Sequence, residues 1–149
     1  KIYIDTRPES TYSMVKHLEE QMAQKFVRWD PSLSITALRF SNVMNPDDYE
    51  KFPSFDADAR QRSWNLWGYI DARDGANAIR LALETSRPGY DVFNIFAGDT
   101  VMTRPNAELV AEVFPDVEIR GELGVNTSLT STAKAERLLG WVPQHSWRD

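Results

Sequence analysis

The chain has 149 residues, of which 42% are hydrophobic and 11% aromatic. This length and composition are typical of one globular domain with a sizeable core and not of a disordered chain. The formal net charge of −5 argues against nucleic acid or an anionic membrane surface as the main partner. A small anionic ligand stays compatible with this balance, because one or two local arginines suffice to bind it.

The sequence contains no cysteine, which excludes disulfides, zinc–thiolate sites, iron–sulfur clusters and thiol catalysis. This absence fits a reducing compartment, and we expect a cytoplasmic location. No apolar run approaches membrane-spanning length and no signal peptide is visible, so we expect no membrane partner. Residues 1–5 indicate a short strand without an initiator methionine, and we therefore expect a fragment of something longer.

An amphipathic helix is predicted from about Tyr12 to Arg28, after a turn in which Ser10 or Thr11 serves as N-cap. Its apolar residues recur at helical spacing and form a broad stripe: Met14, Val15, Leu18, Met22, Phe26 and Val27. Such a stripe belongs either to a core or to a subunit interface.

Further elements follow from periodicity and from helix start and stop signals. Strands are predicted at residues 35–40 and 91–96, and helices at 71–86, 105–114 and 132–139. In the helix over 71–86 we expect four side chains to face inward, those of Ala76, Ile79, Ala82 and Leu83. The alternation of strands and helices indicates an α/β fold with a partly parallel sheet.

Residues 44–63 are rich in proline and acidic residues and predict a long irregular loop that covers a substrate. The acidic residues at 47–48 and 56–58 lack the spacing of a calcium loop, so a solvated surface is favoured over a cation site. His17 and His145 have no second ligand at metal spacing, and we expect both at the surface. The aromatic residues of 64–70 belong to the core or stack on a sugar, with the core favoured.

Tyr12 and Lys16 are four residues apart and therefore lie one turn apart on the same face of the predicted helix. A phenol is a poor base at neutral pH, because its reference pKa is about 10. A neighbouring ammonium favours the phenolate and lowers that pKa, so the pair can move a proton to or from a hydroxyl. The alternative is an exposed helical turn in which the two residues meet by chance.

Four motifs occur in order along the chain: Tyr12-x-x-x-Lys16, Leu38-Arg-Phe-Ser-Asn-Val43, Tyr69-Ile-Asp-Ala-Arg-Asp74 and Ala133-Lys-Ala-Glu-Arg-Leu-Leu-Gly-Trp141. Together they resemble the second half of the NAD-dependent epimerase/dehydratase family, the extended short-chain dehydrogenases/reductases. The resemblance implies one domain over residues 1–149, formed by the C-terminal part of a Rossmann-type fold plus a small substrate-binding α/β subdomain. The N-terminal nucleotide-binding half would be absent.

The same resemblance implies an NAD- or NADP-dependent, epimerase/dehydratase-like oxidoreductase that acts on a nucleotide sugar. Tyr12 matches the active-site base, and Lys16 matches the lysine that holds the nicotinamide ribose. Ser41 matches a residue beside the nicotinamide. Asn42 and Arg120 match residues that contact the substrate, with Arg120 on its diphosphate. Residues 117–120 predict a short strand or extended piece, and an arginine at the end of a strand can also be merely solvated. Both readings of Arg120 therefore stay open.

Asp74 matches an acidic residue that opens a helix, where a structural role in capping and positioning is expected. The resemblance further implies a homodimer through the Tyr12–Arg28 helix, with Met14, Leu18 and Met22 at the interface.

The sequence also departs from the family pattern. It lacks the glycine-rich nucleotide turn and the catalytic Ser or Thr that family members carry upstream of the tyrosine. Trp67 stands where the UDP-sugar 4-epimerases of the family have an arginine that binds the diphosphate. These departures leave a second function open, that of a non-catalytic module that senses a dinucleotide or a partner. The isolated fragment is expected to be inactive, since it cannot hold adenine and pyrophosphate.

Overall fold

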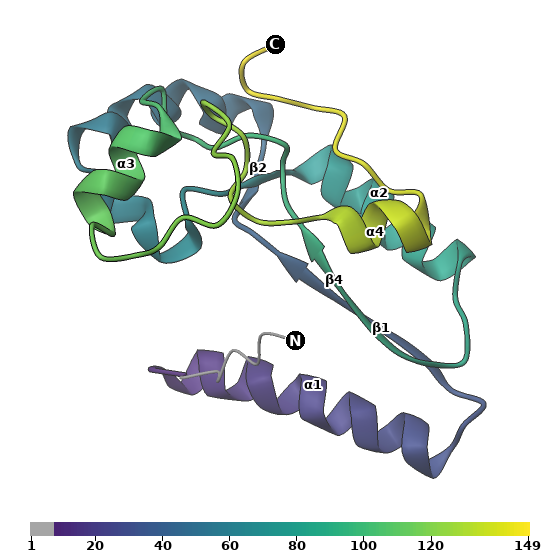
Figure 1. Cartoon of the computed structure of the whole chain (residues 1–149). Coiled ribbons are helices and arrows are strands. Elements are labelled where there is room, and N and C mark those ends of the chain that lie inside the picture. The colour runs from purple at the N-terminus through teal and green to yellow at the C-terminus, as the bar shows by residue number, and fades with distance from the viewer. Residues whose placement is uncertain (1–7) are drawn as a thin grey trace. The chain divides into compact units, whose positions relative to one another are not determined.

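The computed structural model describes residues 8–149, so the strand expected at residues 1–5 lies outside the described part (Figure 1). The chain divides into two compact units. Unit 1 comprises Lys1–Ala37 and Thr85–Val92, and unit 2 comprises Leu38–Glu84 and Phe93–Asp149.

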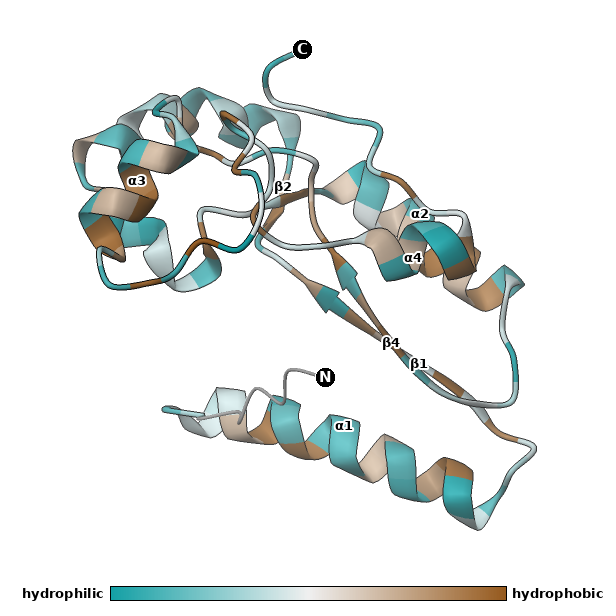
Figure 2. Cartoon of the chain, viewed as in Figure 1, coloured by the Kyte–Doolittle hydropathy of each residue, from teal (hydrophilic) through white to brown (hydrophobic). Residues whose placement is uncertain are grey.

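Helix α1 (Thr11–Trp29) confirms the helix predicted over residues 12–28. It begins in a capping box, because the Ser10 hydroxyl accepts from the Ser13 backbone N–H at 3.1 Å while the Ser13 hydroxyl accepts from the Ser10 N–H at 3.1 Å. Apolar and polar segments alternate along the helix (Figure 2). No residue of α1 is buried, so its apolar stripe contributes to no core formed by the described residues.

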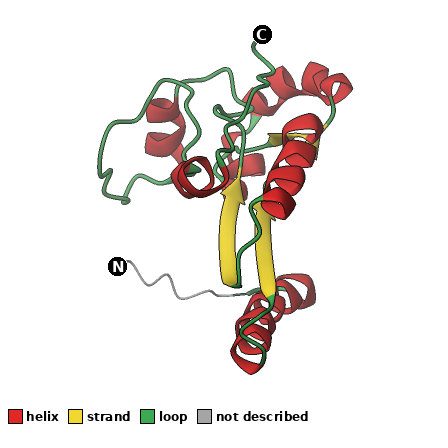
Figure 3. Ribbon diagram, turned by 90° about the vertical axis from the view of Figure 1, so that its right-hand side faces the viewer, coloured by secondary structure: helices red, strands yellow, loops and turns green. Residues whose placement is uncertain are grey.

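Strands β1 (Ser34–Phe40) and β4 (Gly89–Ile95) are hydrogen-bonded neighbours and confirm both predicted strands (Figure 3). A second small sheet pairs β2 (Val43–Met44) with β3 (Ile70–Asp71) in parallel, with Val43 opposite Ile70. The α/β fold with a partly parallel sheet is therefore as expected.

The prediction of an irregular loop over residues 44–63 is wrong. After β2 the chain forms two 3₁₀ helices, η1 (Pro46–Ala57) and η2 (Ala59–Asn65). Pro46 starts η1 because its fixed φ suits a first helical turn. Asp48 accepts from the Asn45 N–H at 3.0 Å, and Asp58 accepts from the Arg60 N–H at 2.9 Å. These acidic side chains thus cap helical turns, a use that composition does not reveal.

Helix α2 (Ala72–Glu84) occupies its predicted place, but the expected inward face is largely wrong. Ala76, Ile79 and Leu83 are exposed, and of the four expected residues only Ala82 is buried. The residues buried in this helix are Asp74, Gly75, Ala78 and Ala82. Small side chains let the helix pack closely: a Cβ on Gly75 would lie 3.4 Å from the Phe40 ring.

Helices α3 (Asn106–Val113) and α4 (Ala133–Leu139) complete the predicted set. Gly140 ends α4 with φ at 67°, a left-handed conformation that glycine adopts without a Cβ clash.

Two apolar clusters form the core of unit 2. One contains Phe52, Ala59, Trp67, Tyr69, Ala97, Val101, Met102, Leu109 and Val110. The other contains Ile70, Ala78, Ala82, Phe93, Ile95, Ala135, Leu139 and Trp141. The aromatic stretch at 64–70 is therefore mainly core, since Trp67 and Tyr69 are fully buried while Trp64 is 71% exposed.

The carboxylate of Asp74 anchors the C-terminal segment to the start of α2. One of its oxygens accepts from the backbone N–H groups of Gln144 and His145 at 2.9 and 3.0 Å. The other lies 2.9 Å from Nδ1 of His145. Trp141 adds a bond from Nε1 to the Asp74 carbonyl at 3.1 Å. His145 therefore lies only partly at the surface, because its imidazole is bonded to a buried carboxylate.

Replacing Asp74 with Ala should lower the free energy of unfolding by about 3 kcal/mol, since several donors in the C-terminal segment lose their acceptor. Urea denaturation measures this change. Asp47→Ala serves as the control at an exposed position and should change stability by no more than about 0.5 kcal/mol. Equal losses in the two variants would contradict the anchoring role.

Candidate functional site

Tyr12 and Lys16 lie on the first turns of α1, where the capping box fixes the start of the helix. The Lys16 ammonium lies 5.7 Å from the centre of the Tyr12 ring, so the structure brings the two groups together as the spacing predicts. Tyr12 is 73% exposed and therefore open to a ligand.

Lys16 also pairs with Glu19, with Nζ 2.9 Å from the carboxylate. The hydrogen bond to Glu19, followed by its Coulomb attraction, raises the pKa of Lys16. The ammonium is thus held in its charged form beside the phenol. An exposed pair of this kind is weak because solvent screens it, so a ligand can draw Lys16 away at little cost.

Ser41 and Asn42 follow the end of β1, and their backbone joins three strands. The Ser41 N–H donates to the Ile95 carbonyl at 3.3 Å, and the Asn42 carbonyl accepts from the Ile70 N–H at 3.0 Å. The Ser41 hydroxyl is enclosed and has no partner among residues 8–149. Ligands of α/β proteins commonly bind at the carboxyl ends of parallel strands, which is where these two residues lie.

Arg120 lies beside a pocket of about 350 Å³ in unit 2. The wall of the pocket is mainly apolar and includes Leu66, Val110, Phe114, Val117, Leu123 and Leu129. The Arg120 side chain is 76% exposed and pairs with Glu118 at 3.0 Å. Arg120 belongs to unit 2 together with Ser41 and Asn42, whereas Tyr12 and Lys16 belong to unit 1.

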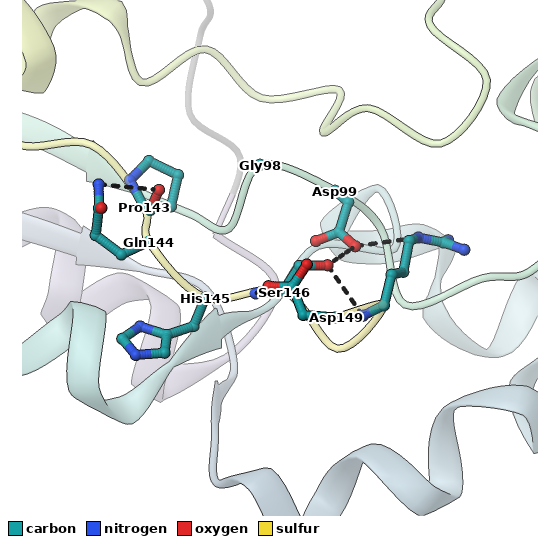
Figure 4. A pocket seen from close by; sticks show the side chains of 8 residues that line it. Gly98, Asp99, Pro143, Gln144, His145, Ser146 and Asp149 are labelled. Carbon is teal, nitrogen blue, oxygen red and sulfur yellow. Dashed lines mark hydrogen bonds and ion pairs between the residues drawn. The ribbon is translucent and has the colours of Figure 1, made fainter.

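A second hollow, of about 220 Å³, lies between the loop at Gly98 and the C-terminal segment (Figure 4). Asp99 accepts hydrogen bonds there from the hydroxyls of Tyr69 and Ser146 at 2.8 and 2.9 Å and from Nε of Arg148 at 3.1 Å. Burial, followed by the Asp99 charge, raises the pKa of Tyr69, so this phenol stays neutral. The polar groups here bind one another, so we assign this hollow a structural role, the attachment of the C-terminal segment to the loop at Gly98.

A hydrogen-bonded triad of Tyr49, Asp71 and Arg73, of which Asp71 is the buried member, escaped the sequence analysis. Asp71 is fully buried and accepts from the backbone N–H, Nε and Nη2 of Arg73 at 2.7, 2.8 and 2.8 Å, and from the Tyr49 hydroxyl. The Arg73 hydrogen bonds hold the pKa of Asp71 well below its usual range. Burial and Asp71 raise the pKa of Tyr49. The closeness of Asp71 to Arg73 in the sequence could have suggested this pair, but nothing in the sequence points to Tyr49.

The lowered pKa of Asp71 makes the triad sensitive to acid. Its stabilisation is fully present above the unfolded pKa of about 3.9 and is lost as pH falls through the lower folded value. Asp71→Asn should therefore lower the free energy of unfolding at pH 7 by about 2 kcal/mol. In this variant the free energy of unfolding should also fall less steeply as the pH is lowered from about 5 to 3. Urea melts across this range measure both effects. Asp116→Asn, at an exposed position, is the control, and an unchanged pH profile in Asp71→Asn would refute the assignment.

No protein-family model matches the chain, and no curated relative matches it by sequence. Within residues 8–149, no cluster of side chains suits a metal ion and no helix is both long and apolar enough to cross a membrane.

Comparison with solved structures identifies the fold. UDP-N-acetylglucosamine 4-epimerase from Bacillus cereus is 23% identical with a TM-score of 0.58, over 95% of this chain and 50% of that one. RMD from Pseudomonas aeruginosa, solved with NADPH, is 15% identical with a TM-score of 0.57, over 98% and 55%. The Bordetella bronchiseptica enzyme WbmF, solved with NAD⁺, is 20% identical with a TM-score of 0.57, over 98% and 51%.

The chain thus spans about half the length of each of these three proteins. Because the sequence identities are 15–23%, the similarity shows a shared fold and nothing more specific. The chain has the fold of about half of such a protein, as the resemblance to the NAD-dependent epimerase/dehydratase family predicts.

Proposed function

We propose that this chain is the substrate-binding, C-terminal half of an NAD- or NADP-dependent oxidoreductase that epimerises, dehydrates or oxidises a sugar or nucleotide sugar. The observation that carries the proposal is the Lys16 ammonium 5.7 Å from the Tyr12 ring on an open helical face. The shared fold supports it, since the similar structures include a UDP-N-acetylglucosamine 4-epimerase and complexes with NADPH and NAD⁺.

Tyr12 acts in this proposal as the acid–base residue. As a phenolate it takes the proton of a sugar hydroxyl, and the C–H electrons of the same carbon leave as hydride, so that a carbonyl forms. Bound NAD(P)⁺ supplies the hydride acceptor. Lys16 stabilises the phenolate by Coulomb attraction and, with three N–H donors of which Glu19 takes one, keeps donors for a ribose.

In this proposal the remaining site residues bind and orient the cofactor and the substrate. The Ser41 hydroxyl, which has no partner within residues 8–149, suits a polar group beside the strand ends, and we assign Ser41 to the cofactor. Asn42 and Arg120 are assigned to the substrate. Arg120 lies next to a pocket, and its guanidinium fork suits phosphate oxygens once it leaves Glu118. A cytoplasmic location stays a prediction, as does the inactivity of this half alone.

Tyr12→Phe in the full-length protein should lower NAD(P)-linked turnover by about 100-fold or more, because the proton acceptor is lost. Absorbance of the reduced nicotinamide measures the rate. Tyr90→Phe removes a phenol hydroxyl from β4 and should leave the rate within about twofold of the wild type. Undiminished turnover in Tyr12→Phe would disprove the acid–base role.

A second function, a non-catalytic module that senses a dinucleotide or a partner, is favoured by Trp67. This residue is fully buried and its indole N–H donates to the Ala59 carbonyl at 2.7 Å, so it offers no donor to a diphosphate. Calorimetric titration with NAD and with nucleotide sugars, followed by a turnover assay, separates the two functions. Binding without turnover favours the sensor, whereas turnover excludes it.

We further propose a homodimer through the Tyr12–Arg28 helix, because Met14, Leu18 and Met22 are each about half exposed on α1. Leu18→Glu should shift the protein from dimer to monomer, since a charge at an apolar interface is costly. Light scattering coupled to gel filtration measures the mass. The control Gln24→Glu alters an exposed polar position on the same helix. An unchanged mass in Leu18→Glu would exclude this interface.

A further inference from the structure

The pocket of about 350 Å³ in unit 2 has a wall that separate parts of the chain build together. Phe114 is the C-cap of α3 and Leu66 is the C-cap of η2, and both line the pocket. A turn in which the Val117 N–H donates to the Phe114 carbonyl at 3.1 Å leads into residues 117–123, most of which line it too. The tertiary fold of unit 2 therefore forms this pocket, and no single segment does.

The inner wall of the pocket is continuous with the apolar core. Seven of the ten residues that line the pocket have an aliphatic or aromatic side chain. Three of them, Phe114, Leu123 and Leu129, also pack against the core cluster that contains Trp67. The Phe114 ring meets the Trp67 ring edge to face, with 5.9 Å between the ring centres. The core thus holds one aromatic ring in place at the pocket.

The outer wall exposes apolar side chains to solvent. Val117 and Ile119 line the pocket and are 59% and 52% exposed. Glu118 lies between them in the sequence, is not among the lining residues, and pairs with Arg120 at 3.0 Å. The charges of this segment therefore bind each other, while its apolar side chains face the pocket. Apolar side chains grouped in this way mark a binding site, because a ligand that covers them removes apolar surface from water.

Leu66 enters the wall from a backbone conformation that is unusual for leucine. Leu66 and Trp67 have φ values of 54° and 56°, in the left-handed region that costs non-glycine residues energy. Glycine adopts this conformation freely and is the usual residue at such a cap. A leucine there indicates that its side chain has a use in the wall, and strained residues of this kind cluster at ligand sites.

We propose that this pocket binds an aromatic hydrocarbon group of one or two fused rings. A cavity of about 150 Å³ is enough to hold benzene, so a pocket of about 350 Å³ accommodates two fused rings. Phe114 offers an aromatic ring to such a group, and the aliphatic wall covers the rest of its surface. The inference goes beyond the proposed function, because it adds an aromatic group to the ligand and involves no proton or hydride transfer.

The lining favours a hydrocarbon ring over a nucleobase. Its hydrogen-bonding side chains, Arg120 and Glu122, are both exposed. A nucleobase that entered the pocket would turn its polar edge from water toward apolar side chains, which is costly. A hydrocarbon ring has no polar edge to desolvate.

Calorimetric titration of the full-length protein with 2-naphthol and with uridine tests the proposal. 2-Naphthol supplies two fused hydrocarbon rings with a single hydroxyl, whereas uridine supplies a ring edged with polar atoms. The wild type should bind 2-naphthol at least about tenfold more tightly than uridine, because the hydrocarbon rings lose few hydrogen bonds to water.

Two variants place the binding in this pocket. Ile119→Asp puts a charge into the wall and should weaken 2-naphthol binding at least about tenfold. Val125→Asp is the matched control, because Val125 is 68% exposed and is not a lining residue, and it should keep the wild-type affinity. Leu66→Gly removes a wall side chain where glycine suits the backbone, and should weaken 2-naphthol binding about threefold or more. It decides the matter if circular dichroism shows that Ile119→Asp does not fold.

Three results overturn the proposal. They are an affinity for uridine that equals or exceeds the affinity for 2-naphthol, a wild-type affinity for 2-naphthol in a folded wall variant, and an equal loss in Val125→Asp and Ile119→Asp. These titrations measure no turnover, so their outcome is independent of the Tyr12→Phe assay.

Discussion

The buried carboxylate of Asp74 is the interaction on which the second unit of the chain depends. It opens α2 and at the same time accepts two backbone N–H groups and an imidazole from residues about 70 positions later in the sequence. A charge enclosed in this way is stable only while all its donors stay in place. Asp74 therefore couples the packing of α2 to the path of the C-terminal segment, which in turn buries Trp141.

Carboxylates that accept several hydrogen bonds recur in unit 2, at the buried Asp71 and at the partly buried Asp99. Asp71 joins β3 to the 3₁₀ helix η1 through Tyr49, and Asp99 collects Tyr69, Ser146 and Arg148. In each case the acid is satisfied by several donors, which is the condition under which a charge can be buried at all. The acidic composition of the chain thus serves internal architecture as well as its surface. Against this background Arg62 stands out as a buried cation for which residues 8–149 provide no counter-ion.

Two kinds of local structure position the residues of the candidate site. Tyr12 and Lys16 lie on a regular helix, so their mutual geometry follows from a spacing of four residues and a well-formed N-cap. The residues on the substrate side depend instead on strand ends and 3₁₀ turns that only the whole fold places. This division is consistent with the proposed function, in which a regular helix holds the acid–base pair and loops and turns bind the substrate.

The sequence by itself determined the elements whose signals are local. The helices α1, α2, α3 and α4 and the strands β1 and β4 follow from periodicity and capping residues, and the proximity of Tyr12 to Lys16 follows from helix geometry. Only the tertiary structure decided which side chains are buried. Ile79 and Leu83 were expected inside but are exposed, while Gly75 and Ala78 are buried, with Gly75 packed beside the Phe40 ring. The 3₁₀ helices, the Asp74–His145 bond and the burial of Arg62 depend on partners distant in the sequence or on the packing around them, which no local pattern encodes.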